Sequence, residues 1–174
     1  MGKVDREFYL ADAVTVARQL PGMELVMAAG EKYRRHLITE TEAYLGDSDR
    51  ACHASRGRTR RTEPMYLEGG HLYIYFVYGM HWMLNVVTGP TEHPQAVLIR
   101  GVSQYPGPGR VTKGLGIDGS FNREDLASSG RIWIENTGFR PELVAGPRVG
   151  IEYAGEPWIS KPWRFMIRNE KERI

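Results

Sequence analysis

Residues 72–85, LYIYFVYGMHWMLN, contain two alternating runs on either side of a glycine. Successive strand residues point to opposite faces. The first run therefore has an apolar face and a face with two tyrosines: Leu72, Ile74 and Phe76 against Tyr73, Tyr75 and Val77. Gly79 predicts a reversal and residues 82–87 predict a returning strand. We therefore expect an antiparallel hairpin with Tyr78 and Met80 at its tip.

The stretch TETEAYLG, residues 39–46, precedes this hairpin. In a strand, Glu42 and Tyr44 point to the same face. Residues 45–63 follow without apolar periodicity and contain several glycines and aspartates, which predicts a long loop with one helical turn near residues 50–54. Long loops in compact domains are usually functional or disordered. The segment from Thr39 to Asn85 is therefore the part of the chain around which we expect the protein to be organised.

Apolar spacing and turn residues predict the other elements. Asp12, or Asp5 before it, is placed to cap a helix that ends before Pro21. Further strands are predicted at residues 23–27, 36–43, 95–102, 131–135, 148–153 and 163–168, and short helices at 111–117 and, capped by Asn122, at 123–127. This pattern predicts one α+β domain over residues 1–174, with a curved antiparallel sheet, a few helices and a protruding hairpin.

The length, charge and cysteine content of the chain limit the kind of protein that it can be. A chain of 174 residues has the size of one domain. The net charge of +2 does not by itself indicate a nucleic-acid partner, but residues 50–61 contain five arginines and no acid. That run suits phosphates, although a solvated basic loop explains it equally well. The sole cysteine, Cys52, cannot form an internal disulfide.

Neither a signal peptide nor a membrane span is predicted. Four charged residues interrupt the N-terminal segment, and no apolar run approaches the roughly 18 residues of a transmembrane helix. We therefore expect a cytoplasmic or nucleoid protein with no membrane partner. No cluster of histidine, cysteine and carboxylate residues has metal-ligand spacing, so we expect no metal and no organic cofactor.

Glu42 and Arg100 are the first candidates for chemistry. Most glutamates are surface charges or ion-pair partners, but Glu42 shares its face with Tyr44 and is followed by the polar loop. Arg100 is the only charge in an apolar predicted strand, and burying it without an anion would be costly. A buried Glu–Arg pair without any chemistry satisfies these observations equally well.

The aromatic and polar residues of the hairpin and loop give a second signal. Tyr73 and Tyr75 alone would be read as half-buried strand aromatics. Tyr78 is different, because a hairpin tip offers no core, and an exposed wedge near arginines is what proteins insert between base steps. A loop histidine such as His53 is more often a surface group or phosphate contact than a base. Asn85 is suited to a cross-strand hydrogen bond or to reading a base edge.

These motifs together resemble one family. The stretch TETEAYLG, then His53, LYIYFVYGMHWMLNVV, AVLIRGV, GPGR, PRVGIEYAGEPW and WRFMI, is similar to the alkyladenine (3-methyladenine) DNA glycosylases, from about Phe8 to Ile167. The resemblance implies a monomeric, monofunctional hydrolase of base excision repair. Its substrate would be double-stranded DNA that contains alkylated or deaminated purines, and its product an abasic site.

The resemblance also implies roles for individual residues. Glu42 would be the general base that activates water, and Arg100 would help to hold that water, with the main-chain carbonyl of Val149 as a weaker candidate. The flipped base would contact Tyr44, His53, Tyr75 and Asn85, of which Asn85 disfavours guanine. Tyr78 would fill the gap in the duplex, and further DNA contacts are expected from Met80, Arg56, Arg58, Arg60 and Arg61.

This sequence departs from the family pattern in places. Pro21 stands where a leucine is common, the arginine loop at residues 55–63 differs in length and composition, and GPGR continues with VTKGLG. Two rival interpretations remain: a protein that binds damaged or single-stranded nucleic acid without cutting it, and a structural α+β domain in which the tyrosines are core residues.

Overall fold

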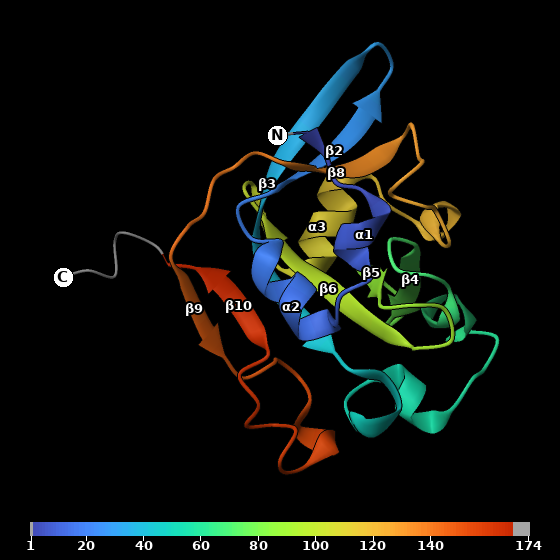
Figure 1. Cartoon of the computed structure of the whole chain (residues 1–174). Helices are drawn as coiled ribbons and strands as arrows, with labels where there is room; N and C mark the ends of the chain where they lie inside the picture. The colour runs from blue at the N-terminus through green and yellow to red at the C-terminus, as the bar shows by residue number, and fades with distance from the viewer. Residues whose placement is uncertain (1, 169–174) are drawn as a thin grey trace.

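Strand β3 (Lys32–Tyr44) is the longest strand and joins the two parts of the sheet. The computed structural model describes residues 2–168, in which ten strands form one branched antiparallel sheet with the order β1-β8-β2-β3-β6-β5-β4 (Figure 1). The other strands are β1 Gly2–Lys3, β2 Glu24–Ala29, β4 Leu72–Val77, β5 His81–Thr88, β6 Gln95–Val102, β7 Tyr105–Pro106, β8 Ile132–Asn136, β9 Leu143–Gly146 and β10 Arg164–Ile167. The fold is α+β, as the sequence predicts.

Strand β3 changes its partner along its length. Its first part pairs with β2 up to Leu37, and its second part pairs with β10 at residues 40–42. The opposite edge pairs with β6 from Ile38 to Tyr44, with a register shift around Glu40. The register shift and the change of partner let one continuous strand serve two differently directed parts of the sheet.

Helices cover one face of the sheet. The three helices are α1 (Arg6–Tyr9), α2 (Ala13–Gln19) and α3 (Pro108–Leu115). Asp5 caps α1 and Asp12 caps α2, each through its side-chain oxygen. The hydroxyl of Thr41 donates to the carbonyl of Ala17 in α2, which ties this face of β3 to the helix. The main apolar core lies between these helices and the sheet.

The other face of the sheet is left to the loop that follows β3 and to the segment between β9 and β10. Both segments lie at the lower end of the sheet in Figure 1, where the hydroxyl of Tyr153 donates to the carbonyl of Ala51. As predicted, residues 45–63 contain no strand, and short 3-10 turns occur at Gly46–Ser48 and His53–Arg56. The loop therefore covers part of the sheet without extending it.

The β4–β5 hairpin ends as its sequence predicts. The backbone N–H of Met80 donates to the carbonyl of Val77, and both central residues have positive φ, 54° at Tyr78 and 64° at Gly79. A tight hairpin turn of type I′ requires positive φ at both central residues. Glycine adopts positive φ without strain, whereas tyrosine does not. Tyr78 is 90% exposed and Met80 is 65% exposed. The tip therefore projects from the molecule.

Two predicted elements are wrong. Residues 123–127 are not helical: Asn122 accepts the N–H of Ile74 and Arg123 has a φ of 71°, outside the helical region. Residues 148–153 are not a strand. Arg148 is buried, and the backbone N–H of Val149 donates to the side chain of Glu42 in β3. The strand in this region is β9, which pairs with β10.

Helix α3 begins earlier than predicted. Pro108 lies in the first turn of the helix, where backbone N–H groups have no acceptor within the helix, so the lack of an N–H in proline costs nothing. Gly116 ends the helix in a left-handed conformation. None of the helices in residues 2–168 combines the length and apolar composition needed to cross a bilayer.

Candidate active site

The register of four strands places the candidate side chains in one row. Glu42 of β3 is opposite Leu98 of β6, Leu98 is opposite Asn85 of β5, and Asn85 is opposite Tyr73 of β4. Directly opposed residues of antiparallel strands point to the same face. The row therefore runs across the face that the helices do not cover, below a pocket of about 590 Å³.

Glu42 lies at one end of this row and is fully buried. Its Oε1 atom accepts the backbone N–H of Val149 at 2.7 Å, and its Oε2 atom accepts the hydroxyl of Tyr44 at 2.8 Å. A carboxylate offers about four acceptor positions. Each oxygen of Glu42 therefore keeps capacity for a further donor, such as water.

Burial and the polar neighbours of Glu42 shift its pKa in opposite directions. Burial raises the pKa above its ordinary value, while the charge of Arg100 and the hydrogen bonds from Val149 and Tyr44 lower it. Burial, together with the Glu42 charge, raises the pKa of Tyr44 well above its usual range. Tyr44 therefore stays protonated and remains a hydrogen-bond donor to the carboxylate.

Arg100 is shared between two carboxylates. Its Nε atom donates to Oε1 of Glu40 at 3.0 Å and lies 3.6 Å from Oε1 of Glu42. The nearer partner is thus Glu40, which also receives a longer contact of 3.5 Å from Arg164. Arg100 balances the charge of Glu42 without a direct hydrogen bond to it, which leaves its remaining donors available on the pocket side.

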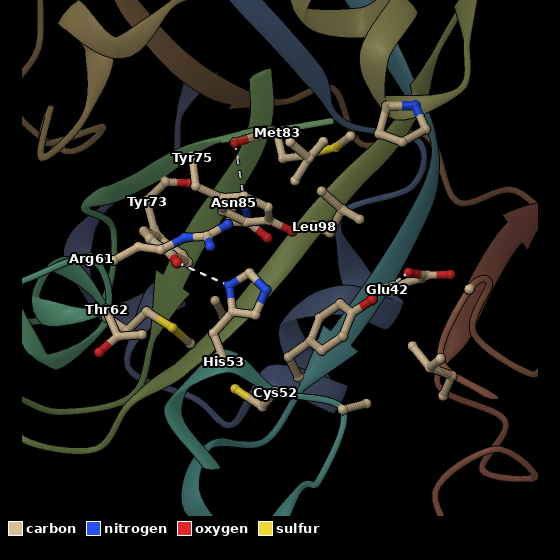
Figure 2. A pocket seen from close by; sticks show the side chains of 18 of the residues that line it. Glu42, Cys52, His53, Arg61, Thr62, Tyr73, Tyr75, Met83, Asn85 and Leu98 are labelled. Atoms are coloured by element: carbon tan, nitrogen blue, oxygen red, sulfur yellow. Dashed lines mark hydrogen bonds between the residues drawn. The ribbon is translucent and has the colours of Figure 1, made fainter. Parts of the chain in front are cut away.

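Three aromatic rings form the other end of the pocket. The ring of Tyr75 lies 4.7 Å from that of His53 and 5.1 Å from that of Tyr73, and Nδ1 of His53 is hydrogen-bonded with the Tyr73 hydroxyl at 3.0 Å. Figure 2 shows these rings facing the same space as Glu42. Burial, with the charges of Arg61 and Arg56, lowers the pKa of His53 to about 4. His53 is therefore neutral at physiological pH.

Asn85 lies in the floor of the pocket and is almost fully buried. Its Nδ2 atom donates to the carbonyl of Tyr73 at 3.1 Å and to that of Met83 at 3.4 Å. These bonds fix the amide plane relative to strands β4 and β5. A rigid polar group in the floor can accept or reject the edge of a flat ring.

The arginines of the loop have different positions. Arg61 reaches over the pocket, with its guanidinium carbon 5.1 Å from the centre of the Tyr75 ring (Figure 2). Arg56 also lines the pocket. Arg58 instead forms an ion pair with Glu92 at 2.8 Å and lies over the ring of Tyr66. Arg60 is exposed.

Most of the predicted site residues line this one pocket. They are Glu42, Tyr44, His53, Arg56, Arg61, Tyr75, Tyr78, Asn85, Arg100 and Val149. The remaining ones, Met80, Arg58 and Arg60, lie outside the pocket lining. Val149 contributes its N–H to Glu42, whereas the sequence singled out its carbonyl.

Sequence reasoning missed several pocket residues. Tyr73 belongs to the same strand face as Tyr75, so the two-residue alternation contained its signal. Tyr153, which lines the pocket, had no local signal, because its partner Ala51 lies 102 positions away in the chain. The buried pair of Asp49 and Arg148 does not line the pocket, and it was missed for the same reason, since 99 positions separate the two residues. Among residues 2–168, no group of three or more histidine, cysteine or acidic side chains is arranged to hold a metal ion.

Comparison with known proteins places this chain in a family of DNA glycosylases. A family model of methylpurine-DNA glycosylases matches residues 7–106 and 103–171, which together cover nearly the whole chain. The chain therefore belongs to the methylpurine-DNA glycosylase family.

Relatives at full length support this assignment. A protein of Borrelia garinii subsp. bavariensis, named “Putative 3-methyladenine DNA glycosylase”, is 43% identical over 97% of both chains. Proteins with the same name in Myxococcus xanthus and Methanocella arvoryzae are 39% and 37% identical, over 98% and 97% of this chain and 93% and 94% of theirs.

Proposed function

We propose that this protein is a monofunctional DNA glycosylase that flips a damaged purine out of duplex DNA and hydrolyses its N-glycosidic bond. The observation that carries this proposal is the position of Glu42, fully buried and joined by one row of side chains to three aromatic rings in a pocket of about 590 Å³. Pockets that bury small ligands have volumes in this range. The full-length relatives named as 3-methyladenine DNA glycosylases support the same activity.

Base flipping is required because the glycosidic bond cannot be reached inside a duplex. Tyr78, exposed at the hairpin tip, would replace part of the stacking that the extruded base loses. The base would stack against Tyr44, His53 and Tyr75. An alkylated purine with a positive charge gains a cation–π attraction there of about 0.5–2 kcal/mol. Asn85 would crowd the exocyclic amine of guanine.

Hydrolysis follows from the chemistry of Glu42. The carboxylate takes a proton from a water molecule, the water oxygen forms a bond to the anomeric carbon, and the base leaves with the electrons of the glycosidic bond. The sugar gains positive charge as that bond breaks, so the carboxylate attracts it most strongly in the transition state. Arg100 would help to position the water.

The pocket favours hydrolysis over a lyase reaction. A lyase needs an amine nucleophile, and the described residues that line the pocket include no lysine. The product would therefore be an abasic site and a free base. Deaminated purines such as hypoxanthine are included in the proposed substrate range, and the protein is proposed to act as a monomer.

Glu42→Gln tests this proposal against the alternative of a protein that only binds damaged nucleic acid. Glutamine keeps the shape and accepts the N–H of Val149, but it cannot take a proton from water. We expect the variant to bind a duplex with one 7-methylguanine about as well as the wild type and to release the base at least about a hundredfold more slowly, the size of a general-base contribution. Free base is measured by chromatography, and equal release by the two proteins would reject the hydrolytic mechanism.

The thermal stability of the same variant is an independent control. Because folding raises the pKa of Glu42, stability is lost as the pH rises from the ordinary glutamate value through the raised pKa, and the whole cost of the buried charge is present above the raised pKa. We therefore expect Glu42→Gln to unfold at the same or a higher temperature than the wild type at neutral pH. The difference should shrink as the pH falls toward the ordinary glutamate value of 4.5. A lower melting temperature at neutral pH would mean that loss of activity reflects loss of structure.

A further inference from the structure

We infer that Arg148 is a positioning residue for the Glu42 carboxylate, which it orients through Val149 and Tyr44. Within residues 2–168, no hydrogen bond or ion pair joins Arg148 to Glu42 directly; its polar partners are Ala43 and Asp49. The inference rests on the proposed role of Glu42 as general base. It extends that role by naming the group that holds the base in its working geometry.

The guanidinium of Arg148 is held through both of its terminal nitrogens, while its buried Nε has no hydrogen-bond partner among the described residues. Its side chain is fully buried, and it grips Asp49 with two parallel bonds, Nη1 to Oδ2 at 2.5 Å and Nη2 to Oδ1 at 2.9 Å. Nη1 also donates to the carbonyl of Ala43 at 2.9 Å. The flat group lies between two rings, 4.8 Å from the centre of Tyr44 and 5.0 Å from that of Trp163. A planar fork held in this way has very little freedom.

This arrangement determines where both donors to Glu42 lie. Val149 follows Arg148 directly in the chain, and its N–H reaches Oε1 at 2.7 Å. The Tyr44 ring rests on the guanidinium, and its hydroxyl reaches Oε2 at 2.8 Å. Ala43, whose carbonyl Arg148 binds, stands between Glu42 and Tyr44 in β3. One side chain thus aligns the loop and the strand that hold the two carboxylate oxygens.

Asp49 extends the same link to the aromatic end of the pocket. Its Oδ2 atom accepts the N–H of Leu45 at 3.0 Å, and its Oδ1 atom accepts the N–H of Ala51 at 3.1 Å. These bonds fold the chain between β3 and His53. The pair of Arg148 and Asp49 therefore connects the proposed general base with the segment that carries one of the stacking rings.

Loosening this arrangement has a predictable effect on the pH dependence of catalysis. The hydrogen bonds from Val149 and Tyr44 both lower the pKa of Glu42, so their loss raises it further. A general base works only when it is deprotonated, hence activity should be lost on the acidic side of the pH profile and recover as the pH rises. The other charged or titratable groups that face Glu42 would stay in place: Arg100 on β6, Glu40 on β3 and Tyr75 on β4, with Arg164 on β10 held through Glu40.

Arg148→Lys tests the inference. Lysine keeps a positive charge beside Asp49, but it has neither the two-pronged donor nor the flat surface that orients Tyr44. We expect single-turnover base release from a 7-methylguanine duplex to fall about tenfold or more on the acidic side of the profile, the worth of one hydrogen bond to a charged group. At alkaline pH it should return to within about threefold of the wild type, since the deprotonated base then predominates.

Arg6→Lys is the matched control. Arg6 has a similar combination of contacts, to the carboxylate of Asp125 at 2.5 Å and to the carbonyl of Gly69 at 2.6 Å, but it lies outside the pocket. We expect this variant to melt at a lower temperature without any change in the shape of its pH profile. A drop in stability alone is thereby separated from an effect on Glu42.

Asp49→Asn decides the question where Arg148→Lys fails to fold: asparagine removes the negative charge of the pair and keeps one acceptor oxygen, so that one of the two loop N–H groups, of Leu45 or Ala51, loses its partner as well. Its acidic limb should shift in the same direction. A folded variant with the wild-type profile, or with an equal loss at every pH, would overturn the inference. Glu42→Gln separates the two proposals. Full activity in that variant would reject the proposed mechanism, whatever the result for Arg148→Lys. If Glu42→Gln is inactive and the pH profile of Arg148→Lys is unshifted, only the positioning role is rejected.

Discussion

At the scale of single residues, the site depends on charges placed where water cannot screen them. Glu42 has no exposed surface. Its carboxylate is stabilised by two hydrogen-bond donors, Tyr44 and Val149, and by the charge of Arg100. His53 is kept neutral by burial and by nearby arginines. The pocket thus combines a carboxylate at one end with neutral aromatic rings at the other, where Arg61 lies over the ring of Tyr75.

Arg61 gives a prediction at this scale. In the free protein its guanidinium lies on the Tyr75 ring, where a flipped base would stack, so a base must displace it. We expect Arg61→Met to bind 7-methylguanosine about three- to thirtyfold more tightly than the wild type, the range of a cation–π contact. Fluorescence titration below neutral pH, where the ring is cationic, measures this without any DNA phosphate.

Arg58→Met is the control for that titration, because Arg58 belongs to the same loop but is held by Glu92 and Tyr66 away from the pocket. Its affinity for the nucleoside should match the wild type. Unchanged or weaker binding by Arg61→Met would show that Arg61 does not compete with the base.

At the scale of elements, the β4–β5 hairpin carries a conflict between stability and its proposed role. Tyr78 occupies a turn position with a φ of 54°, where asparagine followed by glycine is preferred. A bulky residue in this region costs on the order of 1–2 kcal/mol. Its side chain is 90% exposed and recovers little of that cost by packing. An aromatic residue at this position is what the proposed insertion into DNA requires, whereas a core role does not fit its exposure.

Tyr78→Asn separates these interpretations. We expect the melting temperature to rise by roughly 2–4 °C for each kcal/mol of strain relieved, while affinity for a duplex with a damaged purine falls. Calorimetry and an equilibrium binding assay measure the two effects. If the variant melts earlier and binds DNA as before, Tyr78 is a structural residue and the proposed insertion is wrong.

At the scale of the whole molecule, the distribution of charge matters more than its sum. The net charge is only +2, yet three arginines from the loop at residues 45–63, Arg50, Arg56 and Arg61, line the pocket. A duplex presented to Tyr78 would meet this cluster. Binding should therefore depend strongly on salt even though the protein as a whole is nearly neutral.

The salt dependence can be assigned to residues. Replacing one arginine that contacts a phosphate should reduce the slope of log affinity against log salt concentration by about 0.9. We expect this reduction for Arg56→Gln. We expect no change for Arg58→Gln, because Glu92 and Glu63 already compensate that charge. Equal slopes for all three proteins would remove Arg56 from the DNA interface.

The sequence by itself determined which side chains share a face. Two-residue alternation predicted the hairpin, the common direction of Glu42 and Tyr44, and the tyrosine face of β4, because a strand's faces follow from backbone geometry alone. Apolar spacing also predicted α2 with either Asp12 or Asp5 as its cap, and the structure assigns Asp12 to α2 and Asp5 to α1. The irregular segments were harder to predict, because their hydrogen-bond partners are distant in the chain: the side-chain oxygen of Asn122 accepts the N–H of Ile74, and the N–H of Val149 donates to the carboxylate of Glu42.

The contacts between different strands and loops could be learned only from the folded structure. The bond from Val149 to Glu42 spans 107 positions, and the ion pair of Arg148 with Asp49 spans 99. Arg100 was paired with Glu42 by reasoning from the sequence, but the register shift in β3 puts Glu40 closer. Local periodicity contains no information about such partners. They follow from the order of the strands and from the point at which β3 exchanges β2 for β10, and both are properties of the folded chain as a whole.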